Sequence, residues 1–200
     1  MSFVLLAIGN FISPLWDIPA TSAPAAEFAR YAGDNRGELI AGVFTFGLAM
    51  AAFLFFAAGL AVLMYRRDAL LATAFALGAA TLTAVVFVGF VPILVLAYRT
   101  PAPSEAHTLV DLTFGILAFS GFPTALATGA YAEFIRRTRA LPAWTGWLGA
   151  LAAVAHVAIG ATFAFSSGFL SVEGAAIIFI PAALFVWMLG TGIALVRAPD

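Results

Sequence analysis

Long apolar stretches alternate with short polar connections along most of this chain. The apolar stretches cover residues 3–18, 38–65, 69–98, 108–135, 144–166 and 173–196. A helix needs about 20 predominantly apolar residues to cross the hydrocarbon core of a bilayer. The last five stretches reach that length, and we therefore predict that each forms a membrane-spanning helix.

The amino-terminal region has a weaker pattern. Residues 3–18 form a short apolar stretch interrupted by Asn10, Ser13 and Pro14, so it fits a sixth span or a re-entrant segment. A cleaved signal peptide is a further alternative, but no basic residue precedes the apolar stretch. Residues 19–37 form the longest polar connection, in which "AAEFARYA" predicts a short amphipathic helix at the membrane surface.

Three prolines interrupt the predicted spans. Pro92, Pro123 and Pro181 lie within the stretches 69–98, 108–135 and 173–196. A proline inside a helix removes one backbone hydrogen bond and kinks the helix. We therefore predict kinks at these positions, with a cavity between the splayed helices, whereas the small residues of "GWLGALAA" predict close packing of the fifth span.

Composition agrees with a single membrane domain. The 200 residues are 64% hydrophobic and 10% charged, with a mean hydropathy of +1.07. We predict an all-α, polytopic transmembrane bundle of about six spans over residues 1–200. The chain lacks cysteine, and its net charge of -1 without a basic run excludes nucleic acid as a partner.

Arginine placement predicts the orientation. The predicted connections on one side carry six arginines and those on the other side carry three. Loops rich in arginine remain in the cytoplasm. Both termini are therefore expected in the cytoplasm if residues 3–18 cross. All nine basic residues are arginine, which together with the abundance of alanine and glycine suggests a high-GC bacterial gene, and we therefore expect a bacterial inner membrane. The two groups are Arg66, Arg67, Arg136, Arg137, Arg139 and Arg197, against Arg30, Arg36 and Arg99.

Acidic residues stand at the outer ends of three spans, at Glu38, Asp111 and Glu173. A carboxylate in the first turn of a helix is stabilised by the helix dipole. Asn35 with Glu38, and Thr108 with Asp111, have the spacing of a capping box. Helix capping and a role in binding or proton transfer are both open for these acids.

His156 is the polar residue that the membrane tolerates least. It follows Trp144 by 12 residues, which places it roughly 18 Å into a hydrocarbon core of about 30 Å. An unpaired polar group there costs several kcal/mol, so the ring needs a protein partner, water or a ligand. The alternatives are a functional histidine and a neutral structural one.

His107 precedes Asp111 by four residues, which permits an acid/base pair or a solvated loop histidine.

The segment "LPAWTGWLGALAAV", residues 141–154, carries a resemblance. It resembles a family of uncharacterised integral membrane proteins of about 200 residues from high-GC bacteria. The matching residues are Leu141, Pro142, Trp144, Gly146, Trp147, Leu148 and Gly149. The stretches "AEFARYAGDNRGEL" and "LGTGIALVRAP" are also similar. The resemblance implies a roughly six-helix fold and no particular activity.

The first functional hypothesis is a membrane enzyme acting on a lipidic or prenylated substrate. A carboxyl group in a water-poor pocket stays neutral and can protonate an alkene or epoxide, as in cyclases and isomerases. Asp111 or Glu38 would be the acid and His156 its partner, without a metal or cofactor. Substrate contacts are expected from His107, Arg99, Glu173, Phe119, Phe122 and Trp187.

The alternative is a non-catalytic membrane protein that binds a lipophilic ligand or a partner membrane protein. It requires only a pocket or the small-residue helix faces. A small transporter subunit, which could function as a homodimer, is a weaker alternative because few charges lie within the spans. Haem bound by His107 and His156, or zinc bound by these histidines with Asp111 and Glu38, is conceivable but not required by their spacing.

Overall fold

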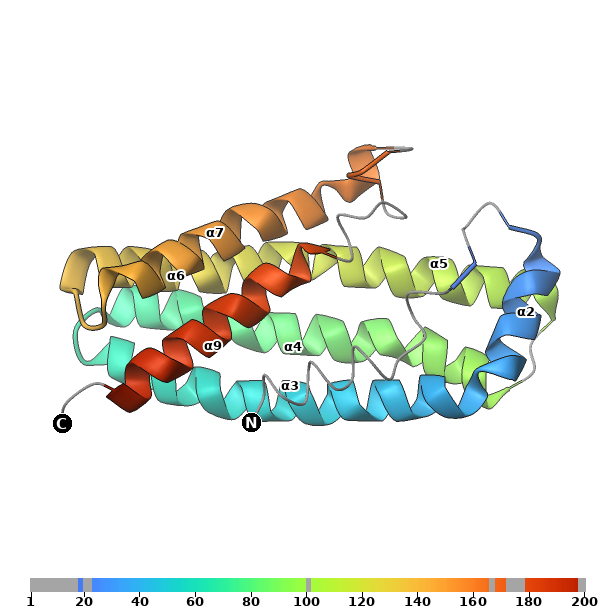
Figure 1. Ribbon diagram of the computed structural model, residues 1–200, viewed down its shortest axis with the longest axis horizontal. Coiled ribbons are helices and arrows are strands. Elements are labelled where there is room, and N and C mark those ends of the chain that lie inside the picture. The colour runs from blue at the N-terminus through green and yellow to red at the C-terminus, as the bar shows by residue number, and fades with distance from the viewer. Residues whose placement is uncertain (1–17, 20–22, 100–101, 166–167, 172–178, 198–200) are drawn as a thin grey trace.

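A computed structural model describes residues 18–19, 23–99, 102–165, 168–171 and 179–197, and nothing is described for the rest (Figure 1). The described residues contain helices and connections but no strand. The prediction of an all-α bundle is therefore confirmed for this part of the chain. The helices run roughly along one long axis, and the shorter α2 crosses one end of the bundle (Figure 1).

The helices follow the predicted apolar stretches closely. α4 coincides with the predicted span 69–98, whereas α5 begins five residues earlier than expected. The elements are α2 (Ala25–Asp34), α3 (Arg36–Tyr65), α4 (Ala69–Tyr98), α5 (Pro103–Phe119), α6 (Gly121–Thr138), α7 (Ala143–Gly160), the 3₁₀ turn η2 (Thr162–Ala164) and α9 (Pro181–Arg197).

Four helical segments are long and apolar enough to cross a membrane. They are Arg36–Tyr65, Ala69–Tyr98, Pro103–Thr138 and Ala143–Ala164. These lengths are compatible with an integral membrane protein. The predicted last span, 173–196, is described only as the 17-residue helix α9, because residues 172–178 lie outside the described part. The predicted stretch 3–18 also lies outside it, apart from Ile18.

The helix predicted at "AAEFARYA" is present as α2. Its Phe28 and Ala32 are buried, and Phe28 belongs to a cluster with Leu39 of α3, Ile93 of α4 and Val110 of α5. The apolar face of α2 therefore packs on the protein, where the sequence favoured contact with the membrane surface.

The three prolines act differently. Ser120 separates α5 from α6 three residues before Pro123, and its N–H donates to Leu117 O at 3.1 Å. A turn at Ile180 precedes α9, which begins at Pro181. α4 continues without interruption through Pro92. The helix is therefore broken near two of the predicted kink positions, and at Pro92 it is not.

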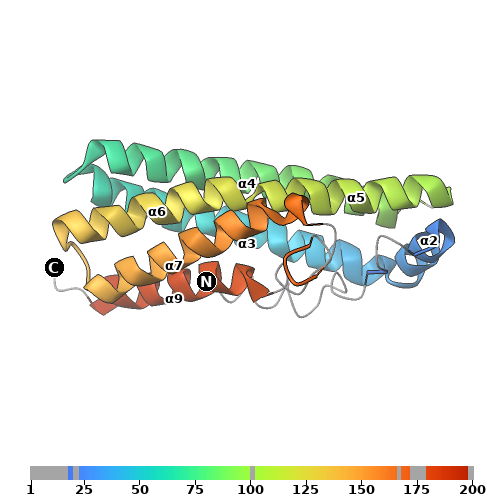
Figure 2. The same ribbon diagram turned by 90° about the horizontal axis from the view of Figure 1, so that it is seen from above.

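α6 lies between α4 and α7 in the bundle (Figures 1 and 2). Glycines let the backbones approach closely on both sides. A Cβ added to Gly78 of α4 would lie 2.7 Å from Ala127 N and 2.9 Å from Pro123 O of α6. A Cβ added to Gly121 of α6 would collide with His156 O and lie 2.7 Å from Gly160 N of α7. These contacts fix α6 against both neighbours.

Replacing Gly121 with alanine is expected to destabilise the bundle. The added methyl group would meet backbone atoms of α7, which cannot move aside without shifting the helix, at a cost of about 1–3 kcal/mol. Thermal unfolding of the detergent-purified protein, followed by circular dichroism, should show a lowered Tm. Gly59→Ala is the matched control, since nothing lies within 4 Å of its Cβ position. An equal Tm for both variants would contradict the close approach at Gly121.

Candidate functional site

A cavity of about 180 Å³ lies inside the bundle and touches His156. Its walls come from α3, α4, α5, α6, α7 and α9, joined by Ser120, and are mostly apolar. The polar residues in the lining are Thr113, Ser120, Thr124 and His156; the apolar ones are Phe46, Met50, Phe53, Leu82, Val86, Phe90, Phe114, Leu117, Ile159, Pro181, Leu184, Phe185 and Met188.

The His156 ring is satisfied on one side only. The residue is 3% exposed, and Nδ1 lies 2.8 Å from Ala152 O, one turn earlier in α7. Because a carbonyl oxygen can only accept, Nδ1 carries the hydrogen and donates it. In the neutral ring Nε2 is then an acceptor, and no hydrogen bond to Nε2 is formed within the described residues. The histidine therefore offers one acceptor beside the cavity.

Among the hydroxyl groups that line the cavity, those of the two threonines have local partners, and no hydrogen bond is formed by the hydroxyl of the half-buried Ser120 within the described residues. Thr113 Oγ1 donates to Leu109 O at 3.0 Å, and Thr124 Oγ1 donates to Ser120 O at 2.7 Å. Both bonds run to the carbonyl four residues earlier, a common arrangement for threonine in a helix. The threonine donors are thus used, and His156, at 3% exposed, is the most deeply buried side chain at the cavity with free hydrogen-bonding capacity, since Ser120 is only half-buried.

His107 and Asp111 form a pair in the first half of α5, away from the cavity. His107 Nδ1 and Asp111 Oδ2 are 3.6 Å apart, and their side chains are 35% and 47% exposed. The ring of His107 also packs edge-on against Phe28 of α2, with 5.1 Å between centroids. The predicted proximity of the two residues is present. Neither residue lines the cavity beside His156.

The predicted helix caps do not form. Thr108 lies inside α5, where its hydroxyl donates to Ser104 O, and the carboxylate near this helix start is Glu105, which accepts from Ala102 N at 3.2 Å. The reason is that α5 begins at Pro103, one turn before the expected start. Asn35 precedes α3, but its side-chain amide donates back to Tyr31 O, 2.9 Å away, instead of capping α3.

The other outer-end candidates lie apart from His156. Glu38 is exposed in the first turn of α3. Arg99 ends α4 and lines a separate groove of about 870 Å³ together with Glu105 and Thr108. Glu173 lies outside the described residues. Neither Glu38 nor Arg99 lines the cavity beside His156, which we call the central cavity.

The aromatic candidates occupy two further places. Phe119 and Phe122 are about half exposed and pack against each other, with 6.0 Å between ring centroids. Trp187 is fully buried and packs against Tyr131, Phe56 and Phe75. None of the three aromatic candidates lines the cavity beside His156, and their role in substrate binding stays a prediction.

A buried hydrogen-bond chain beside Trp187 was not predicted from the sequence. Thr191 Oγ1 of α9 donates to Tyr131 OH of α6 at 3.4 Å, and Tyr131 OH donates to Thr145 Oγ1 of α7 at 2.8 Å. Thr145 Oγ1 donates in turn to Pro142 O at 2.9 Å. The chain joins three helices, whereas Nε1 of Trp187 has no partner among the described residues. The presence of polar residues within apolar spans was a signal in the sequence for such a chain. The sequence does not show which side of each helix these residues occupy, so their contact could not be predicted.

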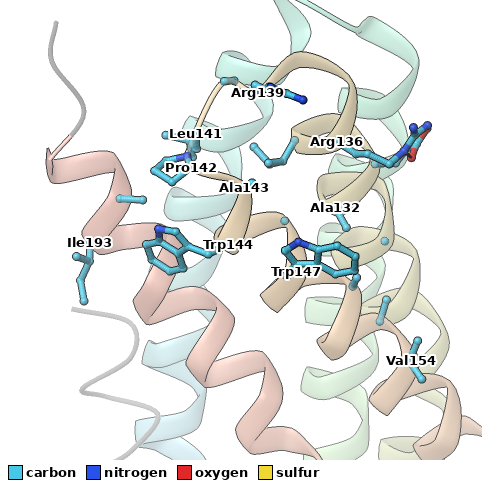
Figure 3. A pocket seen from close by; sticks show the side chains of 18 of the residues that line it. Ala132, Arg136, Arg139, Leu141, Pro142, Ala143, Trp144, Trp147, Val154 and Ile193 are labelled. Atoms are coloured by element: carbon cyan, nitrogen blue, oxygen red, sulfur yellow. Dashed lines mark hydrogen bonds and ion pairs between the residues drawn. The ribbon is translucent and has the colours of Figure 1, made fainter.

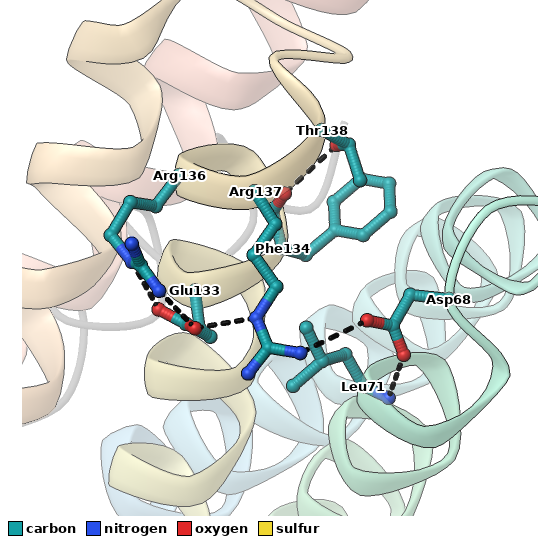
Figure 4. A network of polar contacts seen from close by, with 7 residues as sticks. All are labelled: Asp68, Leu71, Glu133, Phe134, Arg136, Arg137 and Thr138. Atoms are coloured by element: carbon teal, nitrogen blue, oxygen red, sulfur yellow. Dashed lines mark hydrogen bonds and ion pairs between the residues drawn. The ribbon is translucent and has the colours of Figure 1, made fainter.

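Ion pairs organise the end of the bundle where the α3–α4 and α6–α7 connections lie (Figure 4). Glu133 accepts from both Arg136 and Arg137 at 2.6 Å. Arg137 also lies 3.6 Å from Asp68, whose carboxylate accepts from Leu71 N and caps α4. We call this region the arginine-rich end, since it carries the six arginines grouped together from the sequence.

A groove of about 1200 Å³ opens on the outer face of α6, α7 and α9 at this end (Figure 3). Arg136, Arg139, Arg197 and Glu133 are its charged residues, and Trp144 and Trp147 are its aromatic ones. It shares no lining residue with the central cavity. The two sites lie on opposite faces of α7.

The described residues contain no group of three histidine, aspartate, glutamate or cysteine side chains that could hold a metal ion. His107 and His156 do not share a site, because one pairs with Asp111 and the other lines the cavity. Comparisons with protein families, curated proteins and solved structures found no match for this chain. The resemblance to a family of bacterial membrane proteins therefore stays a prediction.

Removing the hydroxyl group of Tyr131 should weaken the packing of α6 against α7 and α9. Tyr131→Phe breaks the bonds to Thr145 and Thr191, and we expect a loss of about 1 kcal/mol in the free energy of unfolding. Denaturant titration of the purified protein in detergent measures it. Tyr65→Phe is the control, because Tyr65 is 64% exposed. A loss no larger than that of the control would contradict a stabilising role for the chain.

Proposed function

We propose that this chain is an integral membrane protein that binds a lipophilic ligand in the cavity beside His156. The observation that carries the proposal is the combination of an apolar cavity with one buried acceptor, Nε2 of His156, that has no partner within the described residues. Ligand sites are mostly apolar with a few polar groups that orient the ligand. The four long apolar helices support placing this cavity within a bilayer.

The size and polarity of the cavity indicate the class of ligand. Its volume of about 180 Å³ is close to that of engineered apolar cavities, roughly 150 Å³, that take up benzene. A free acceptor selects a ligand that can donate. The ligand therefore presents a ring-sized apolar group with a hydroxyl, such as a phenol, to His156.

Acid catalysis receives less support than ligand binding. The first hypothesis needs a carboxyl group beside His156, and no aspartate or glutamate is among the residues that line the cavity. Asp111 is two residues from Thr113, which lines the cavity, but it lies on the other side of α5 and is 47% exposed. The carboxyl group of Asp111 and the water-poor cavity beside His156 therefore lie in different places. We propose ligand binding in preference to acid catalysis for this reason.

We further propose that the arginine-rich end faces the cytoplasm of a bacterial cell. Positively charged loops are retained on that side during insertion. The α3–α4 and α6–α7 connections supply Arg66, Arg67 and Arg139, and the salt bridge between Arg137 and Asp68 supports placing both connections at the same end. The opposite end, with α2 and the start of α5, would then face outward.

Ligand selectivity tests the proposed binding function. ¹⁹F NMR titration of the purified protein in detergent should show saturable binding of 4-fluorophenol about threefold to tenfold tighter than that of fluorobenzene, because only the phenol can donate to His156. In His156→Phe the ring-shaped side chain is kept and the acceptor removed, so the two probes should bind equally.

Thr83→Val is the matched control for this titration. Thr83 is buried and its hydroxyl donates to Ala79 O, but it does not line the cavity. The control should therefore keep the preference for the phenol. Absence of saturable binding, or an unchanged preference in His156→Phe, would rule out the proposed site.

The orientation can be measured with single cysteines, since the chain has none of its own. Ala69→Cys places a thiol at the arginine-rich end, and Gly33→Cys places one on α2, where nothing lies within 4 Å of the Cβ position. In intact cells whose outer membrane is permeable, a charged maleimide should label position 33 and should reach position 69 only after the inner membrane is broken. The reverse pattern would invert the proposed orientation.

A further inference from the structure

We propose that the groove at the arginine-rich end binds the phosphate headgroup of an anionic phospholipid. The groove is formed by α6, α7, α9 and the connection between α6 and α7 (Figure 3). Basic pockets between membrane helices on the cytoplasmic side are suited to anionic headgroups. The inference depends on the proposed membrane location of the chain but not on the ligand cavity, which lies on the opposite face of α7.

The charges of the groove do not balance. Three arginines and one glutamate line it. Glu133 is already engaged by Arg136, with two contacts of 2.6 Å, and by Arg137 from outside the groove. Arg139 and Arg197 are exposed and form no ion pair with any other described residue. The guanidinium groups of Arg139 and Arg197 are therefore both available in the groove to bind an anionic ligand.

Arg139 occupies a position where arginine is unfavourable for the backbone. It ends α6 with φ 49°, in the left-handed region, and it is the one described residue other than glycine with a positive φ. Glycine or asparagine would usually fill such a helix end. An arginine costs conformational energy there, and its side chain has no described ion-pair partner to compensate.

The aromatic residues place the groove at the level of lipid headgroups. Trp144 and Trp147 are 46% and 76% exposed on the outer face of α7, with Arg139 in the connection that precedes this helix (Figure 3). Tryptophan is enriched where membrane helices meet the headgroup region. An exposed pair beside two arginines has the composition expected of a headgroup contact.

The apolar part of the groove extends away from the arginines along α7. Its lining runs from Ala143 to Val154, 11 residues apart on the helix, which is about 16 Å. Half of the hydrocarbon core is about 15 Å thick. A free phosphate ion would use only the charged end, whereas a phospholipid would also fill the apolar part with an acyl chain, and we therefore choose the lipid.

Quenching of tryptophan fluorescence tests this site. The protein in non-ionic detergent is titrated with phosphatidylglycerol or phosphatidylcholine carrying brominated acyl chains, which quench Trp144 and Trp147 on contact. The anionic lipid should bind more tightly than the zwitterionic one. Arg139 and Arg197 should each contribute a factor of about five to the ratio of the two affinities. Arg139→Gly and Arg197→Gln should each lower the preference by about fivefold.

Two controls distinguish lipid binding in the groove from general attraction to positive charge and from unfolding. Arg67→Gln removes the same charge from the arginine-rich end but not from the groove, so the preference should remain. Arg139→Gly should have a Tm at or above that of the unmodified protein, because glycine relieves the backbone at φ 49°; weaker lipid binding then cannot be ascribed to unfolding.

Three outcomes would overturn the proposal. The first is an equal affinity for both lipids in the unmodified protein, and the second is an equal loss of preference in Arg67→Gln and Arg139→Gly. The third is displacement of the brominated anionic lipid by millimolar inorganic phosphate alone, which would assign the groove to a soluble anion. A preference that depends on Arg139 and Arg197 and resists phosphate supports the lipid site.

Discussion

The close backbone contact of α6 with α4 and α7 is the constraint on which the rest of this structure depends. Helices in a bilayer gain little from burying apolar surface, because lipid is equally apolar, so they associate where backbones can approach. Gly78 and Gly121 provide that approach on the two sides of α6. Gly149 adds another, since its Cβ position lies 3.0 Å from Thr128 O. These contacts set the relative positions of Tyr131 and of His156, whose own carbonyl lies against Gly121.

Polar groups inside the bundle are satisfied mostly within their own helix. The hydroxyls of Thr83, Thr113, Thr124 and Thr128 donate to the carbonyl four residues earlier, and His156 donates to Ala152 in the same way. This local bond meets only half of the need of an imidazole, because the neutral ring has a donor and an acceptor. The free acceptor beside the cavity is why His156, unlike these four threonines, indicates a ligand.

The two proposed sites use opposite faces of α7 and opposite chemistry. Thr145, Gly149, Ala152 and His156 face into the bundle, where the neutral acceptor Nε2 of His156 lies beside mostly apolar walls. Trp144, Trp147 and Val154 face outward to the groove. Charge in the groove is confined to the helix ends, as expected for the proposed membrane location, because desolvating a charge within the hydrocarbon region would cost several kcal/mol. α7 can therefore contribute to a site for a neutral ligand and to a site for an anionic headgroup, because the two sites share no lining residue.

The sequence alone determined which segments form the long apolar helices, the grouping of arginines at one end and the burial of His156, since these depend on hydropathy and distance along a helix. It could not determine which face of an apolar helix turns inward. Thr113 lines the cavity and Asp111 does not, although they are two residues apart, because successive residues turn by about 100° around the helix. A helix that is apolar on every side carries no amphipathic pattern to reveal that rotation. Only packing between helices decided it, and with it the separation of the acids from His156, the chain through Tyr131 and the place of Arg139 beside the tryptophans.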